Sequence, residues 1–187
     1  MVLFIFPTFA QNKGMKIIFL LILSTSLFAQ DAEMLGYLNQ YRISNGKDTF
    51  IWSNNLSKIS TDQNQTIIKQ DSLSHSHKET EIAVMGNSLP IHSDRFIGFL
   101  KNQFKIDHVD SSKLIKCCKL YIIYLFDSST KHKQILLGDY KYIGFDVVIK
   151  DIEFKQETIS LGGKTISFKP TCKVHFYSVM NLKKKNN

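Results

Sequence analysis

A glycine pair, Gly162-Gly163, is the feature that most constrains the fold of this chain. Apolar and polar residues alternate on both sides of the pair, over residues 158–168. Alternation with a period of two is typical of a half-buried strand. Two-residue loops between antiparallel strands favour positive φ values, which glycine adopts without steric cost. The segment therefore predicts a β-hairpin with the glycines at its tip. Its arms carry Ile159, Leu161, Ile166 and Phe168.

Two further predicted strands flank the hairpin, and helical patterns precede them. Residues 142–149 and 172–179 are rich in β-branched and aromatic side chains, which is typical of strands. Upstream, the apolar residues recur at spacings of three and four, the period of an amphipathic helix. This pattern covers residues 31–44, 53–71, 95–104 and 113–126. Helices first and adjacent antiparallel strands last predict an α+β domain with helices covering the sheet.

An apolar run near the N-terminus predicts export from the cytoplasm. The run covers residues 17–28, with Met15-Lys16 before it and Ala29 after it, which are the parts of a secretory signal. It is shorter than the roughly 20 helical residues that cross a bilayer. We therefore expect residues 1–29 to be cleaved off, leaving a secreted or periplasmic protein with no stable membrane anchor. Residues 1–14 are interpreted as lying upstream of the true start at Met15.

One domain is expected after cleavage, over residues 30–182, because no repeat or low-complexity linker divides this part of the chain. A basic tail at residues 183–187 follows and is interpreted as a solvated terminus. The chain has a formal net charge of +8. Outside the tail, however, it has no basic helix and no interleaving of basic with aromatic residues. Nucleic acid is therefore not an expected partner.

The mature chain has three cysteines, Cys117, Cys118 and Cys172, and two interpretations of them stay open. In an oxidising compartment, Cys172 pairs with one of the two neighbours and leaves the other free. Alternatively, Cys117 and Cys118 are small apolar residues on a helix. Three cysteines do not make a disulfide scaffold, so an apolar core must hold the domain.

Five short blocks then follow one another in the order of a known family. They are Asn39-Gln40-Tyr41-Arg42, Phe50-Ile51-Trp52-Ser53-Asn54-Asn55-Leu56, Leu73-Ser74-His75-Ser76, Thr80-Glu81-Ile82-Ala83, and Phe126-Asp127-Ser128-Ser129-Thr130-Lys131-His132 with Tyr142-Ile143-Gly144-Phe145 behind it. In this order the blocks resemble the CAP superfamily, also called SCP-like, which includes cysteine-rich secretory proteins, antigen 5 and pathogenesis-related proteins. The chain resembles a divergent bacterial-type member.

The resemblance implies an α-β-α sandwich, with a central antiparallel sheet covered by helices and a cleft lined by two histidines and two acidic residues. His75 and His132 match the two histidines, and Glu81 matches the first acid. The second acid of the family lies on the helix before the second histidine, but residues 113–126 contain no Asp or Glu. The set of four is therefore incomplete.

The favoured functional interpretation is a binding or interaction protein whose His-lined cleft takes a metal ion or an apolar ligand. Two imidazoles and one carboxylate are acceptable zinc ligands and leave a fourth position open. Zinc held by so few ligands would be weakly bound and lost below about pH 6. Family members also suggest a lipid or sterol as the extracellular ligand. The alternative is a metal-dependent extracellular hydrolase with a degraded set of four residues, and a third hypothesis is an adhesive surface domain.

Three further residues in the blocks are interpreted as structural. Asn39 and Arg42 are predicted to be polar ties under the cleft, although exposed helix positions explain them equally well. Trp52 is predicted to be a core anchor, because an indole ring contributes a large apolar surface.

Overall fold

Helices precede most of the strands along the chain, as the sequence patterns predict. The computed structural model describes residues 32–75, 80–108, 113–155, 158–161, 164–167 and 171–184. The predicted signal segment lies outside these ranges. A helix over residues 32–44 comes first. It is followed by β1 (Ile51–Trp52), α2 (Asn54–Gln70), β2 (Glu81–Leu89), α3 (Asp94–Phe104), α4 (Leu114–Ser128), α5 (Thr130–Leu136), β3 (Tyr142–Lys155), β4 (Thr158–Leu161), β5 (Lys164–Ser167) and β6 (Thr171–Lys183).

The central sheet has four strands in the order β1-β3-β6-β2. The long strand β6 pairs antiparallel with β3 on one side and with β2 on the other. At the far edge, β1 pairs with β3 in parallel through Ile51 and Trp52. The predicted α+β class is confirmed, but the sheet is mixed because of this short parallel strand.

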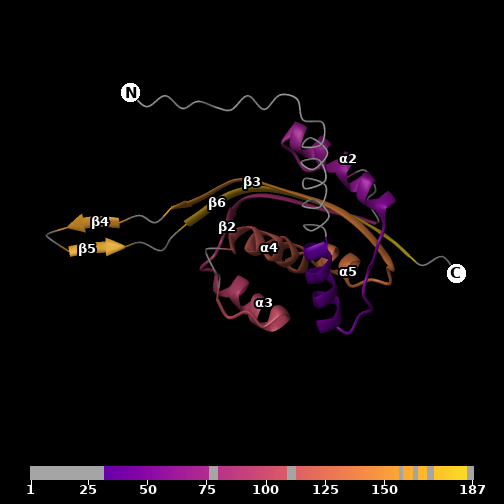
Figure 1. Ribbon diagram of the computed structural model, residues 1–187, viewed down its shortest axis with the longest axis horizontal. Coiled ribbons are helices and arrows are strands. Elements are labelled where there is room, and N and C mark those ends of the chain that lie inside the picture. The colour runs from indigo at the N-terminus through magenta and orange to yellow at the C-terminus, as the bar shows by residue number, and fades with distance from the viewer. Residues whose placement is uncertain are drawn as a thin grey trace, which may run out of the picture. The chain divides into compact units, whose positions relative to one another are not determined.

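Helices cover both faces of this sheet (Figure 1). Helix α2 packs on β3 and β6 at one face, and α4 packs on β2 and β3 at the other, beside α3 and α5. Buried side chains of the helix over residues 32–44, including Met34 and Leu38, join the cluster on the α4 side. The domain is therefore an α-β-α sandwich.

The face that α4 covers is apolar. Alternate residues of the two long strands point to it, among them Phe145 of β3 with Phe176 and Met180 of β6, and all three are buried. Aromatic rings fill the space between this face and the helices. Phe96 of α3 lies edge-on to Tyr121 of α4, with 5.2 Å between ring centroids. This cluster is the main core of the domain.

The face that α2 covers is largely polar. Ser60 Oγ donates to the Gly144 carbonyl oxygen (3.0 Å), and Asn181 Nδ2 donates to Ser60 Oγ (3.1 Å). Gly144 allows the helix to come close, because a Cβ at this position would lie 2.0 Å from the Ser57 nitrogen. The helix therefore rests on the strand by backbone contact and hydrogen bonds, and a small cluster of Ile67, Ala83 and Val179 adds apolar burial.

The predicted hairpin is confirmed by the pairing of β4 with β5. The strands are antiparallel, with Ile159 opposite Ile166 and Leu161 opposite Lys164. The two glycines and Phe168 lie outside the described residues. A pairing from Leu161 directly to Lys164 leaves two residues for the loop, as the glycine pair predicts.

The three cysteines are free thiols, and all three are buried. Burial, together with nearby Cys172 and Cys117, raises the pKa of the Cys118 thiol to about 12. A thiol with so high a pKa is protonated at neutral pH and packs as a small apolar group. The structure thus favours the interpretation of Cys117 and Cys118 as helix residues of the core.

Two elements differ from the sequence-based expectation. The sequence pattern does not predict strand β2, because only the first part of Glu81–Leu89 is apolar and Gly86 with Asn87 is typical of a turn. The helix predicted over residues 113–126 continues to Ser128, and a further helix, α5, begins at Thr130. His132 is therefore a helix residue. The first turn of α5 is capped by Ser129, whose side chain accepts a hydrogen bond from the His132 backbone nitrogen.

Candidate ligand-binding site

The first predicted histidine and the predicted acid are in contact. His75 Nδ1 lies 3.2 Å from Glu81 Oε1. The Glu81 side chain is fully buried, whereas 37% of the His75 side chain is exposed. Glu81 opens β2 opposite Asn181 of β6, on the face that α2 covers. A buried carboxylate thus fixes a ring that still has an open side.

The segment that carries His75 is held from α2. This helix ends in Asp71, which caps it in a left-handed conformation. From within the helix, Gln63 Nε2 donates to the Ser74 carbonyl oxygen (2.8 Å) and to Ser74 Oγ (3.1 Å). These two bonds hold the chain next to His75. Sequence reasoning misses this role, because Gln63 matches only the spacing of the inner helix face.

The second predicted histidine lies within electrostatic range of the first. Burial lowers the pKa of His132 below its ordinary value, and the neighbouring His75 and Lys131 charges lower it further. The His132 ring lies edge-on to the Phe126 ring, with 5.6 Å between centroids. His132 is therefore neutral at neutral pH, with a ring nitrogen able to accept a hydrogen bond. The structure thus joins His75 to Glu81 by direct contact, and His132 is coupled to His75 only through its charge.

The three residues do not fit a three-ligand metal site. Across the described ranges, no group of three or more His, Cys, Asp or Glu side chains is placed to hold a metal ion. Acids elsewhere in the chain could in principle supply the missing member, but Asp107 pairs with His108, and Asp94 lies in the first turn of α3. Glu79, Asp110 and the neighbouring His77 lie outside the described residues. The zinc prediction gains no support from this part of the chain.

The extension of α4 does supply an acid, Asp127, but its contacts lead elsewhere. Tyr41 donates to Asp127 Oδ1 over 2.5 Å, and Lys133 Nζ lies 2.8 Å from the same oxygen. Burial raises the pKa of the Tyr41 hydroxyl well above its ordinary value, and the hydrogen bond to Asp127 adds to this effect. Asp127 therefore ties the first helix to α4 and α5.

Asn39 and Arg42 tie the first helix to the loops at one end of the sheet. The Asn39 side chain makes two hydrogen bonds with the Phe50 backbone, donating from Nδ2 and accepting at Oδ1. Arg42 is buried and stacks on the Phe50 ring, with its Cζ 4.1 Å from the centroid. Its guanidinium donates to four backbone carbonyl oxygens, those of Asp48, Leu136, Gly138 and Tyr140. Both residues hold backbone rather than a ligand.

Trp52 is half-buried at the edge of the sheet. Its ring packs edge-on against Phe145, with 4.9 Å between centroids, and its Nε1 donates to Asn54 Oδ1. The ring thus supports the apolar core from its border and also contacts the start of α2. Its neighbours are β3 and α2, rather than the interior of the core that the sequence predicts for it.

No family model and no curated protein matches this chain. Among solved structures, the chain is similar to an outer surface protein from Borrelia burgdorferi, at 8% sequence identity and a TM-score of 0.43. The match covers 84% of this chain and 94% of that protein. A likeness at this level carries no inference about function. None of the described helices is long and apolar enough to cross a membrane.

Proposed function

We propose that this chain is an exported CAP-like domain that binds a ligand at the region of His75 and His132. The observation that carries the proposal is the buried Glu81 carboxylate beneath the half-exposed His75 ring. A buried carboxylate is costly to desolvate unless it is paired and hydrogen-bonded. By keeping the Glu81 carboxylate under the accessible His75 ring, the fold holds this ring in one orientation, in which it can contact a ligand.

The pair also sets the chemistry of the imidazole. With Glu81 accepting at Nδ1–H, Nε2 is the nitrogen of the His75 ring that is left to contact a ligand. His132 contributes a second imidazole that is neutral at neutral pH. Two imidazoles favour a ligand with a hydroxyl or carboxyl head group, and an apolar body would suit the lipid class suggested by the resemblance.

Binding is preferred to hydrolysis because of what the two rings contact. The described partners are the Glu81 carboxylate for His75 and the Phe126 ring for His132. A hydrolytic base needs a nucleophile or a metal-bound water within hydrogen-bond reach. The described contacts supply no such nucleophile, and the described residues do not fit a three-ligand metal centre.

Calorimetric titration with a long-chain fatty acid and with zinc tests this proposal. The proteins are wild type, His75→Ala, His132→Ala and a matched control, His175→Ala, whose ring is half-exposed beside Asp151. We expect fatty acid to bind wild type and the control alike and to bind both site variants at least about tenfold more weakly. Any zinc binding should be weak at pH 7.5, absent at pH 5.5 and absent from His132→Ala. Equal binding by all four proteins would place the ligand elsewhere.

Export is tested separately on the natural host's culture medium and periplasm. Mass spectrometry of the mature protein should show an N-terminus at Gln30, because Ala29 is the small residue that ends the signal. A mature protein that still begins at Met15 would contradict the export proposal while leaving the ligand site untouched.

A further inference from the structure

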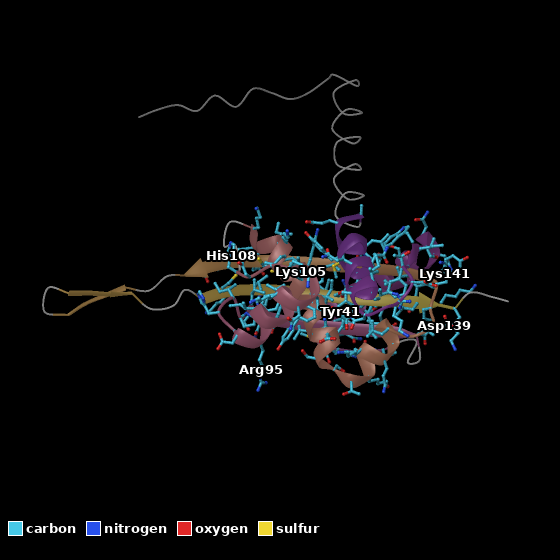
Figure 2. All side chains as sticks on the ribbon, turned by 90° about the horizontal axis from the view of Figure 1, so that it is seen from below. Tyr41, Arg95, Lys105, His108, Asp139 and Lys141 are labelled. Carbon is cyan, nitrogen blue, oxygen red and sulfur yellow. The ribbon has the colours of Figure 1, made fainter. Side chains whose placement is uncertain are left out.

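A basic groove lies around Tyr140, in the loop between α5 and β3. Two cavities, of about 510 and 380 Å³, share Tyr140 and Lys184 in their linings. One extends along α5, and the other extends between α2 and the end of β6. We call the two together the Tyr140 groove. Asp139 and Lys141, on either side of Tyr140, mark this end of the domain in Figure 2, and His108 lies toward the opposite end.

The groove gathers positive charge from separate parts of the chain. Lys131 comes from α5, Lys183 from the last residue of β6, and Lys184 follows it. Asp139 is the acid among the residues that line the two cavities. Strand β6 continues to Lys183, so the first residue of the predicted basic tail is held by the sheet. The ammonium groups are therefore presented from separate elements around a hollow.

An aromatic ring and neutral polar groups lie among these charges. The Tyr140 ring is half-buried, and Lys184 Nζ lies 6.0 Å from its centroid. Gln134 and Thr80 also line the groove and can hydrogen-bond neutral groups. The Asp139 carboxylate can accept hydrogen bonds from hydroxyl groups. The groove thus combines a ring face, cations, and acceptors for hydroxyls.

We propose that the Tyr140 groove binds an acidic polysaccharide. Sugar rings offer an apolar face that packs on an aromatic ring, and carboxylate or sulfate groups pair with ammonium groups. Hydroxyl groups of the sugar use the amide and carboxylate acceptors. A polymer made mainly of phosphates would offer no apolar face to pack on the Tyr140 ring. A flat bilayer surface would contact only the rims of the two cavities and would not reach the residues that line them.

Binding of a heparin-derived hexasaccharide tests the proposal, with maltohexaose as the neutral probe of equal length. We expect wild type to bind the acidic probe and not the neutral one. The double variant Lys131→Gln/Lys184→Gln should bind about tenfold more weakly, the combined scale of two partly exposed ion pairs. Tyr140→Ala should also weaken binding, and Tyr140→Phe, which keeps the ring, should restore it.

The matched control removes two charges outside the groove lining, in Lys101→Gln/Lys105→Gln. Both positions are exposed at the end of α3. The control should bind as wild type does, and circular dichroism should show that both double variants are folded. Equal losses in the two double variants would reduce the effect to net charge and overturn the proposal. Binding of maltohexaose, or tighter binding of phosphatidylglycerol vesicles with the same lysine dependence, would also overturn it. His75→Ala should leave oligosaccharide binding unchanged, which separates this test from that of the His75 site.

Discussion

The two faces of the sheet are covered in different ways. On the α4 face, aromatic and aliphatic side chains interlock, and Phe99 lies 5.4 Å from Tyr124 between ring centroids. On the α2 face, hydrogen bonds replace most of this packing. Both carboxylate oxygens of Asp146 accept from α2, one from Asn64 Nδ2 (2.6 Å) and one from Thr61 Oγ1 (3.4 Å).

The two faces therefore contribute differently, one mainly to the stability of the domain and the other mainly to the position of α2. Apolar burial contributes about 25 cal/mol for each Å² but has no preferred direction. Hydrogen bonds contribute little net free energy, about 0.5–1.5 kcal/mol each, but they fix geometry. The α4 face therefore holds the domain together. The α2 face sets the place of a helix whose end leads, through Gln63 and Ser74, to His75.

The largest effect is expected on the apolar face, from Phe96→Ala. Phe96 is fully buried and packs against Tyr121 and Tyr124. Loss of the ring removes buried area and leaves a cavity, which costs about 3–5 kcal/mol of unfolding free energy. Urea unfolding followed by circular dichroism measures it. Ile115→Ala, at a position of α4 that is 48% exposed, is the control and should stay within about 0.5 kcal/mol. Equal losses would show that the α4 face is not the main core.

Contact between α2 and the sheet is tested by Gly144→Ala. The new Cβ would lie 2.0 Å from the Ser57 nitrogen and 2.3 Å from the Leu56 carbonyl carbon. Backbone atoms cannot rotate away, so α2 must shift, at a cost of about 1–3 kcal/mol. Because α2 carries Gln63, the NMR signals of the His75 ring should move as well.

Gly98→Ala gives the matched control for that substitution. Gly98 lies inside α3, and its added Cβ would meet no atom within 4 Å. Alanine in a helix interior is favoured over glycine by about 0.5–1 kcal/mol, so this variant should be more stable than wild type. A stable Gly144→Ala protein with an unmoved His75 would show that α2 does not rest closely on β3.

The same two faces explain what the sequence can reveal. The helix over residues 32–44, α3, α4 and the strands over residues 142–149 and 172–179 are predictable, because their apolar side chains recur with a clear period and pack in the core. Helix α2 is also predictable from its pattern, although two of its three buried residues, Ser60 and Asn64, are polar. Helix α5 escapes prediction, since its residues are mostly polar and its start depends on the Ser129 cap. Strand β2 is not predictable from its own residues, because it is stabilised by pairing with β6, a distant segment of the chain. This pairing includes a bulge near Gly86.

The candidate site is only partly accessible to sequence reasoning. The resemblance points to His75, Glu81 and His132, and the structure brings His75 and Glu81 into contact. The contacts that position them are not predictable, since Gln63 and Asn181 are polar residues without a recognisable motif. Hydrogen bonds between residues far apart in sequence leave no periodic pattern. Asp127 is overlooked only because the predicted helix ends one residue before it.

The polar tie on the apolar face is tested by Tyr41→Phe. Tyr41 is fully buried, and its hydroxyl donates to the Asp127 carboxylate. Loss of a hydrogen bond to a charged acceptor costs about 1.5–3 kcal/mol, less than the loss of the Phe96 ring. Lys133 remains beside Asp127 and limits the effect. Urea unfolding at pH 7 provides the measurement, and a cost below about 0.5 kcal/mol would contradict the role assigned to this bond.

The unfolding free energy of wild type should fall at high pH relative to that of Tyr41→Phe. The folded pKa of Tyr41 is raised above the ordinary value of 10.0, so the folded state keeps a proton that the unfolded state releases. The stabilisation is complete below pH 10 and is lost as pH rises above it, by up to about 1.4 kcal/mol per pH unit. Wild type should therefore lose stability faster than Tyr41→Phe between about pH 10 and pH 11. Parallel curves would mean that the hydroxyl is not held protonated.

The smallest effect concerns His132, on α5. Burial is the largest cause of its lowered pKa, and the charges of His75 and Lys131 come after it. NMR titration should therefore show that the pKa of His132 rises in His75→Ala and in Lys131→Gln, yet stays below its ordinary value in both. Because the folded pKa is depressed, stability is present above the unfolded pKa and is lost as the medium is acidified. His132→Gln should remove this share of the acid sensitivity. If His75→Ala leaves the His132 titration unchanged while Lys131→Gln shifts it, the two imidazoles do not sense each other, and the region would not be a shared binding site.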